Sequence, residues 1–92
     1  MIFPTYQVSF EKSSFDDSVT VAGEIKNDSS RDYNLAMFRI YLYAKNKRLG
    51  AGIIKIFDFK KNVTKAFRVY VLVGEGKIPK IDRYEIVIEG GY

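Results

Sequence analysis

The sequence contains no cysteine and no histidine, and each absence argues against a class of function. Without cysteine no disulfide can brace the fold, which favours a cytosolic location; the cell surface is the alternative, because bacterial surface domains also lack disulfides. Without either residue the chain has no thiol nucleophile, no histidine acid–base relay and no zinc site of the common types. We therefore expect a protein that is not an enzyme and that uses no cofactor or metal.

Long apolar runs are also missing. The longest, residues 69–73, has the length of one buried strand, whereas a membrane helix needs roughly twenty apolar residues. The first residues lack the basic patch and apolar segment of a signal peptide. We expect no membrane span and a cytoplasmic protein as the sequence stands, although a leader or lipid anchor removed upstream of Met1 is compatible with the same residues.

Ninety-two residues are enough for one domain, so we expect a single domain over 1–92. The dominant periodicity is two, which is typical of half-buried strands. Tyr6, Val8 and Phe10 alternate in the first strand, and Gly50 with Gly52 predicts a bulge or a close backbone approach in the fourth. The predicted strands are residues 5–12, 18–26, 33–44, 49–57, 63–73 and 81–89.

Turn-forming residues separate these strands. Polar clusters predict turns at 27–32, 45–48 and 58–62, and a Gly- and Pro-containing loop at 74–80. With six or seven strands and no amphipathic helix, the pattern predicts an all-β fold, a small antiparallel immunoglobulin-like β-sandwich, with a small barrel as the alternative. The side chains expected in its core are Val21, Ile25, Phe38, Ile40, Leu42, Phe67, Val69, Ile86 and Ile88.

The middle of the chain resembles the FxLYD domain family. Residues 21–27 (VAGEIKN) are similar to the strand and Asn that open this family's domain, and residues 40–44 (IYLYA) fall at its signature. Ile40 replaces the signature Phe, and Ala44 replaces the turn-forming Asp. The similarity spans about residues 18–89 and continues through Phe67 to the closing strand. It implies an immunoglobulin- or fibronectin-like sandwich of prokaryotic proteins, often on the cell surface, with no established activity and no catalytic residues.

Four kinds of short motif suggest chemistry, and each has a simpler interpretation. Residues 74–77 (GEGK) lack the glycine spacing, the following Ser or Thr and the helix of a phosphate-binding loop, so we interpret them as a turn. Asp16 and Asp17 lack the ligand spacing of a calcium loop and are expected at a strand entry. Glu85 and Glu89 could form a glycosidase-like carboxylate pair, but no apolar pocket is indicated around either acid, so we interpret them as part of the solvated outward face of the last strand. The glycosylation-like Asn27 and Asn62 triplets are interpreted as turns.

Charge is distributed unevenly along the chain. Residues 39–68 hold nine basic residues and a single acid, Asp58, so this segment accounts for the net charge of +4. Tyr41 and Tyr43 are expected to face outward on the same strand as Arg39, and Tyr70 on the same strand as Arg68. If these two strands share a sheet, the tyrosines and the cations form one basic aromatic platform. The candidate partner-binding residues are Arg39, Tyr41, Tyr43, Lys45, Lys47, Arg48, Lys60, Lys61, Arg68 and Tyr70.

Three interpretations of the basic segment remain open. It can be a solvated, aggregation-resistant face, since lysines protect edge strands. It can dock another protein or a neighbouring domain, because Tyr and Arg are enriched in interface hot spots. It can bind single-stranded nucleic acid, using residues 45–48, Lys60 and Lys61 for phosphates and the tyrosines for stacking. We expect a non-enzymatic interaction or scaffold module, with a small nucleic-acid-binding protein as the alternative.

Overall fold

The alternation of apolar and polar side chains sets the architecture, because it gives each strand one face to bury. The computed structural model describes residues 2–12, 17–73 and 80–92. This part of the chain forms six strands and contains no helix, so the predicted all-β fold is confirmed. The strands are β1 (Thr5–Lys12), β2 (Ser18–Lys26), β3 (Tyr33–Ala44), β4 (Lys47–Phe59), β5 (Thr64–Leu72) and β6 (Arg83–Gly91).

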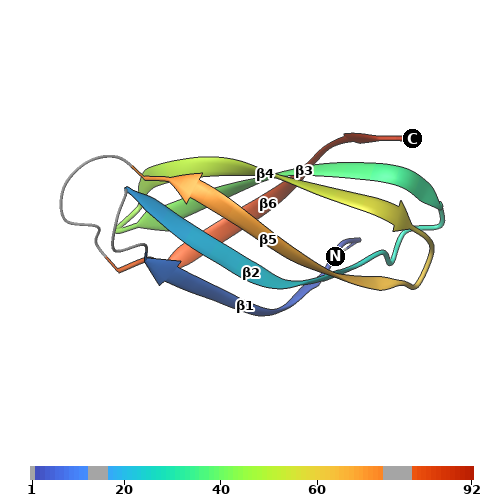
Figure 1. Ribbon diagram of the computed structural model, residues 1–92, viewed down its shortest axis with the longest axis horizontal. Helices are drawn as coiled ribbons and strands as arrows, with labels where there is room; N and C mark the ends of the chain where they lie inside the picture. The colour runs from blue at the N-terminus through green and yellow to red at the C-terminus, as the bar shows by residue number, and fades with distance from the viewer. Residues whose placement is uncertain (1, 13–16, 74–79) are drawn as a thin grey trace.

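The strands form two antiparallel sheets of three, packed face to face (Figure 1). Sheet A has the strand order β1-β2-β5, and sheet B has the order β4-β3-β6. The central strands, β2 and β3, are flanked on both sides and contribute many of the fully buried side chains. The molecule is therefore a small sandwich in which β3 lies at the centre of one layer.

The core lies between the two sheets and contains side chains from both. Phe38, from β3, is fully buried and meets the ring of Phe59 edge to face, with centroids 6.2 Å apart. Phe3, just before β1, contacts both rings and closes this end of the core. Seven of the nine predicted core residues are buried: Val21, Ile25, Phe38, Ile40, Leu42, Phe67 and Val69.

Two expectations for inward side chains are wrong, one because of a bulge and one because of a sheet edge. Gln7 adopts a left-handed φ of 53°, and the pairing with β2 shifts between Tyr6 and Ser9. The alternation therefore changes phase, and Tyr6 is 45% exposed although it was predicted to alternate with Val8 and Phe10. Ile88, predicted to be buried, is 41% exposed although it lies directly opposite the buried Phe38, because β6 is an edge strand and has no further described strand beside it. Ile86, the other predicted core residue of β6, is half-buried and packs on the core.

The ends of the observed strands differ from the predicted ones by a few residues. β4 starts at Lys47, because Lys45 and Asn46, both with positive φ, complete the hairpin turn in two residues. β4 also continues to Phe59, where the left-handed Asp58 changes the phase and buries the last ring. The predicted loop motif at 74–77 and the Asp16 part of the strand entry lie outside the described residues.

One side of the sandwich is closed by close contact between β4 and β5. A Cβ added to Gly50 would collide with the backbone carbonyl of Leu72, and one added to Gly52 would lie 3.0 Å from the Val71 side chain. These two glycines let the edge strands of the two sheets approach each other, which confirms the predicted close backbone approach. The backbones of β1 and β6, the edge strands on the opposite side, lie farther apart, and the Tyr84 side chain spans the space to Thr5 and Phe10.

The end of the sandwich that contains the β4–β5 turn is held by a buried asparagine. The Asn27 amide donates hydrogen bonds to the carbonyls of Arg31 and Phe59, both at 2.9 Å, and its oxygen accepts from Ser29. Its backbone also pairs with Asn62 and Val63 in the β4–β5 turn. The turn interpretation of the Asn27 triplet is thus confirmed, and burial of the side chain leaves it no access for glycosylation.

Candidate interaction surface

The outward tyrosines and arginines lie on two different faces of the molecule. Arg39, Tyr41 and Tyr43 come from β3 and project from the outer face of sheet B, because the alternate residues of this strand are buried. Arg68 and Tyr70 come from β5, which pairs with β2 and belongs to sheet A. The two sets therefore lie on opposite sides of the sandwich, and the shared platform does not form.

The lysines are divided as well. Lys45, Lys47 and Arg48 lie in and just after the β3–β4 hairpin turn, whereas Lys60 and Lys61 lie in the β4–β5 turn. These turns are at opposite ends of a molecule about 42 Å long (Figure 1). The cations that are consecutive in sequence therefore do not form one basic surface. Of these five cations, Arg48 contacts the tyrosines of β3.

Arg48 and Arg83 stack with Tyr41 and Tyr43 on the outer face of sheet B. Tyr43 is directly opposite Arg48 on β4 and Arg83 on β6 in the strand register. The Arg83 guanidinium lies 4.1 Å from the centroid of the Tyr43 ring, and that of Arg48 lies 4.1 Å from Tyr41 and 5.9 Å from Tyr43. We call these four residues the Arg–Tyr ladder. Such cation–π contacts are weak at exposed sites, but they orient the arginine side chains over the rings.

Hydrogen bonds fix the hairpin end of the Arg–Tyr ladder. Arg48 donates to the Tyr43 hydroxyl at 3.4 Å, which raises the pKa of this already cationic guanidinium. Next to Arg83, the Asp82 carboxylate accepts from the Lys45 amide at 2.9 Å, and the Asp82 amide donates to the Tyr43 carbonyl. The hairpin and the start of β6 are therefore joined, so the two arginines are held on the same surface.

Arg39 differs from the arginines of the ladder because it has a carboxylate partner. Its Nε lies 2.6 Å from Oε1 of Glu89. The pair neutralises the middle of the sheet B face. Ile53, 50% exposed, is directly opposite Arg39, and the 64% exposed Phe57 lies further along β4. The face therefore has a cationic aromatic end at the hairpin and an apolar end at the far side.

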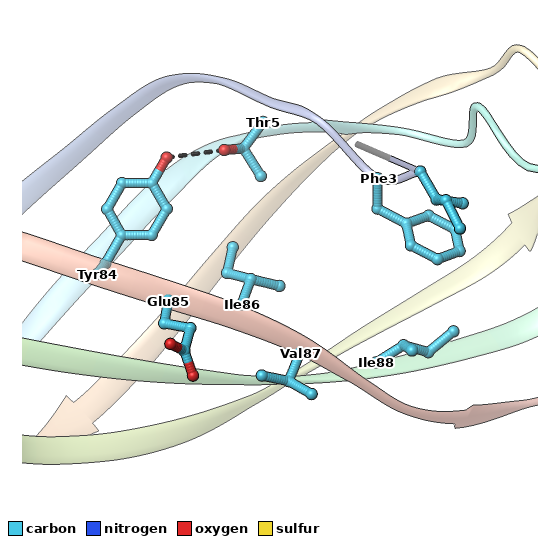
Figure 2. A pocket seen from close by; sticks show the side chains of 8 residues that line it. Phe3, Thr5, Tyr84, Glu85, Ile86, Val87 and Ile88 are labelled. Atoms are coloured by element: carbon cyan, nitrogen blue, oxygen red, sulfur yellow. Dashed lines mark hydrogen bonds between the residues drawn. The ribbon is translucent and has the colours of Figure 1, made fainter.

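Sequence reasoning missed Arg83 and the groove at the β1–β6 side. An apolar groove of about 540 Å³ opens there, between Ile2, Phe3 and Thr5 of the N-terminal segment and residues 84–88 of β6. Figure 2 shows Tyr84 and Ile86 pointing from β6 toward the N-terminal segment, with the Tyr84 hydroxyl 2.7 Å from that of Thr5. The alternation of β6 gave the facing of Arg83, but no local pattern places β6 beside β3.

The described residues hold no group of three or more His, Cys, Asp or Glu side chains that could bind a metal ion. Within the same ranges, no helix is long and apolar enough to cross a membrane. The chain matches no family model, no curated protein and no solved structure. The geometry of the surface is therefore the basis for a functional proposal.

Proposed function

We propose that this chain is a non-enzymatic protein-interaction module on an immunoglobulin-like sandwich, and that its Arg–Tyr ladder binds acidic, extended polypeptide segments. The observation that carries the proposal is the stacking of Arg48 and Arg83 on Tyr41 and Tyr43. The FxLYD resemblance and the prokaryotic origin that it implies belong to the same proposal and stay predictions.

The stacked arginines are suited to carboxylates for a physical reason. A guanidinium has five donors, and stacking on a ring uses its face while leaving donors at its edge. Arg48 is exposed, so these donors reach a partner without a conformational change. Stacking also restricts the arginine side chain before binding, which lowers the entropy lost when a partner docks. Tyr and Arg are moreover the residues in which interface hot spots are enriched.

Charge supports an acidic partner over a basic one. The outer face of sheet B carries four cations against two carboxylates, and Glu89 is already paired with Arg39. The four cations are Arg39, Arg48, Lys55 and Arg83, and the second carboxylate is Glu85. An acidic segment lying along the ladder would meet an excess of positive charge that also accelerates association.

The same geometry gives less support to the nucleic-acid alternative. Base stacking needs open ring faces, and the arginines lie over the rings of Tyr41 and Tyr43. Phosphate binding along a strand would need the lysines in one groove, but Lys60 and Lys61 lie at the other end of the molecule. This alternative stays a prediction and is one outcome of the test.

The test is a binding titration by fluorescence anisotropy at physiological salt. The probes are a labelled short peptide of alternating Glu and Ser, the same peptide with Lys in place of Glu, and a labelled oligothymidine. We expect the acidic peptide to bind best. The variant Arg48→Gln/Arg83→Gln should weaken its binding about tenfold or more, because charged hydrogen bonds contribute roughly 1.5–3 kcal/mol each.

The matched control is Lys60→Gln/Lys61→Gln, which changes the net charge equally at the opposite end. It should leave the affinity for the acidic peptide within about twofold, since screening limits long-range attraction to about 8 Å at this salt. Equal losses in both double variants would contradict a specific ladder. Tighter binding of oligothymidine, lost in Tyr41→Ala/Tyr43→Ala, would replace the proposal with the nucleic-acid function.

A further inference from the structure

The four edge strands of the two sheets differ in how they are protected against pairing with another chain. Exposed edges in soluble proteins are usually blocked by bulges, lysines or a covering segment. β1 has a bulge in its middle at Gln7, and β4 has Lys47 and Lys55 and a phase change at Asp58. The edge of β5 is approached by β4 at Gly50. These three edges therefore carry recognisable protection.

β6 has much less protection between Arg83 and Ile88, since its bulge lies beyond this segment, at Glu89. Its described pairing partner is β3, on one edge only. The segment from Arg83 to Ile88 contains no lysine, no proline and no residue with positive φ, and its register with β3 is regular up to Ile88. The apolar groove lies directly along this segment, with Ile88 41% exposed (Figure 2). An unprotected edge beside an exposed apolar surface is a site for strand addition.

We propose that the occupant of this edge is a second copy of the chain, with the two β6 strands paired antiparallel about a two-fold axis at Ile86. This inference does not depend on the function proposed for the Arg–Tyr ladder: it concerns the backbone edge of β6, although Arg83 belongs to both surfaces. In this register Arg83 lies opposite Glu89 of the second copy, twice by symmetry. On the groove side Ile86 meets its own copy, and Tyr84 lies opposite Ile88, an aromatic–β-branched pair of the kind that stabilises sheets.

Charge selects this register over its neighbours. Residues directly opposite each other in an antiparallel pair have their side chains on the same face of the sheet, so the two-fold axis must pass through a residue. The nearest alternative axes are therefore at Glu85 and at Val87. An axis at Glu85 would place this carboxylate opposite its own copy. An axis at Val87 would place Glu85 opposite Glu89 twice. Like charges directly opposite each other destabilise a sheet, whereas opposite charges stabilise it.

The contacts that Arg83 and Glu89 make within one copy are compatible with dimerisation. Arg39 binds Oε1 of Glu89, and a carboxylate has a second oxygen for another donor. Arg83 stacks on Tyr43 through the face of its guanidinium, which leaves donors at its edge. Pairing through β6 would join two copies of sheet B into one sheet of six strands, with the exposed Ile88 of each copy covered by the other.

Analytical ultracentrifugation of the full chain tests whether a dimer exists. We expect a reversible monomer–dimer equilibrium in the micromolar range, and a purely monomeric protein up to several hundred micromolar would overturn the proposal. Arg83→Glu would place an acid opposite Glu89 of the second copy, twice by symmetry, and should raise the dimer dissociation constant about tenfold or more. Lys55→Glu makes the same charge change on the edge of β4 and should leave the constant unchanged. Equal effects of the two variants would contradict pairing through β6.

Disulfide crosslinking determines the register of the β6 pair, and because the chain has no native cysteine only the introduced thiols can react. Glu85 and Val87 face outward and are exposed, so Glu85→Cys and Val87→Cys should both fold, which circular dichroism checks. With the axis at Ile86 the two new thiols face each other only between different variants. Oxidised glutathione should therefore crosslink the mixture of the two variants, while each variant alone stays largely monomeric on a non-reducing gel. Crosslinking of either variant alone, or of none, would overturn this register.

Discussion

Replacing Asn27 by alanine removes the amide that joins the ends of β2 and β4. The side chain is fully buried, and its bond to the Phe59 carbonyl has no access to solvent. Its other bonds, to the Arg31 carbonyl and from Ser29, are partly buried. A hydrogen bond contributes a net 0.5–1.5 kcal/mol or so, and an orphaned buried group costs about 1–3 kcal/mol. We expect Asn27→Ala to lower the free energy of unfolding by about 3 kcal/mol.

Urea denaturation followed by circular dichroism measures this loss. With a slope of about 1 kcal/mol per molar urea for a small domain, the midpoint should fall by about 3 M. Asn27→Asp keeps the acceptor but turns a carboxylate oxygen toward two carbonyls, and it should be at least as damaging at neutral pH. The control, Asn34→Ala, changes an exposed asparagine and should cost no more than about 0.5 kcal/mol. A loss below about 1 kcal/mol for Asn27→Ala would refute the assigned role.

Two further predictions use the same denaturation assay. Phe67→Ala removes a ring that is 6% exposed and should cost about 3–5 kcal/mol, whereas Tyr41→Ala on the outer face should cost about 1 kcal/mol; equal losses would mean that the facing of these strands is wrong. Gly50→Ala places a methyl group against the Leu72 carbonyl and should cost about 1–3 kcal/mol. Gly90→Ala, with open space around the new methyl group, is its control, and a tolerated Gly50→Ala would contradict the close approach of β4 and β5.

The fold was largely predictable from the sequence because alternation is a local signal. The bounds of β1, β2 and β3 agree with the predicted ranges, and Phe38, Ile40 and Leu42 are buried as expected. Errors arise where a bulge or a sheet edge overrides the alternation. The left-handed Gln7 that exposes Tyr6 has no glycine to mark it, and Ile88 is exposed because β6 lies at the edge of its sheet, which depends on strand pairing.

The candidate surface was only partly predictable, because strand pairing is not a local property. Tyr41 and Tyr43 were placed correctly on an outer face, but their arginine partners come from β4 and β6. Arg68 and Tyr70 have the same outward pattern and lie on the other sheet. The alternation along each strand indicates which face each cationic side chain occupies. It does not say which strands are neighbours, and this decides whether the cations combine.

The most direct test of the interaction-module function is a nuclear magnetic resonance titration of the labelled protein with the Glu/Ser peptide. If the Arg–Tyr ladder is the binding surface, the amides of Tyr41, Tyr43, Arg48 and Arg83 should shift most, and Arg48→Gln/Arg83→Gln should strongly reduce the shifts at the same peptide concentration. Shifts centred on the β4–β5 turn or on the outer face of sheet A, or unchanged shifts in the double variant, would contradict the proposed function.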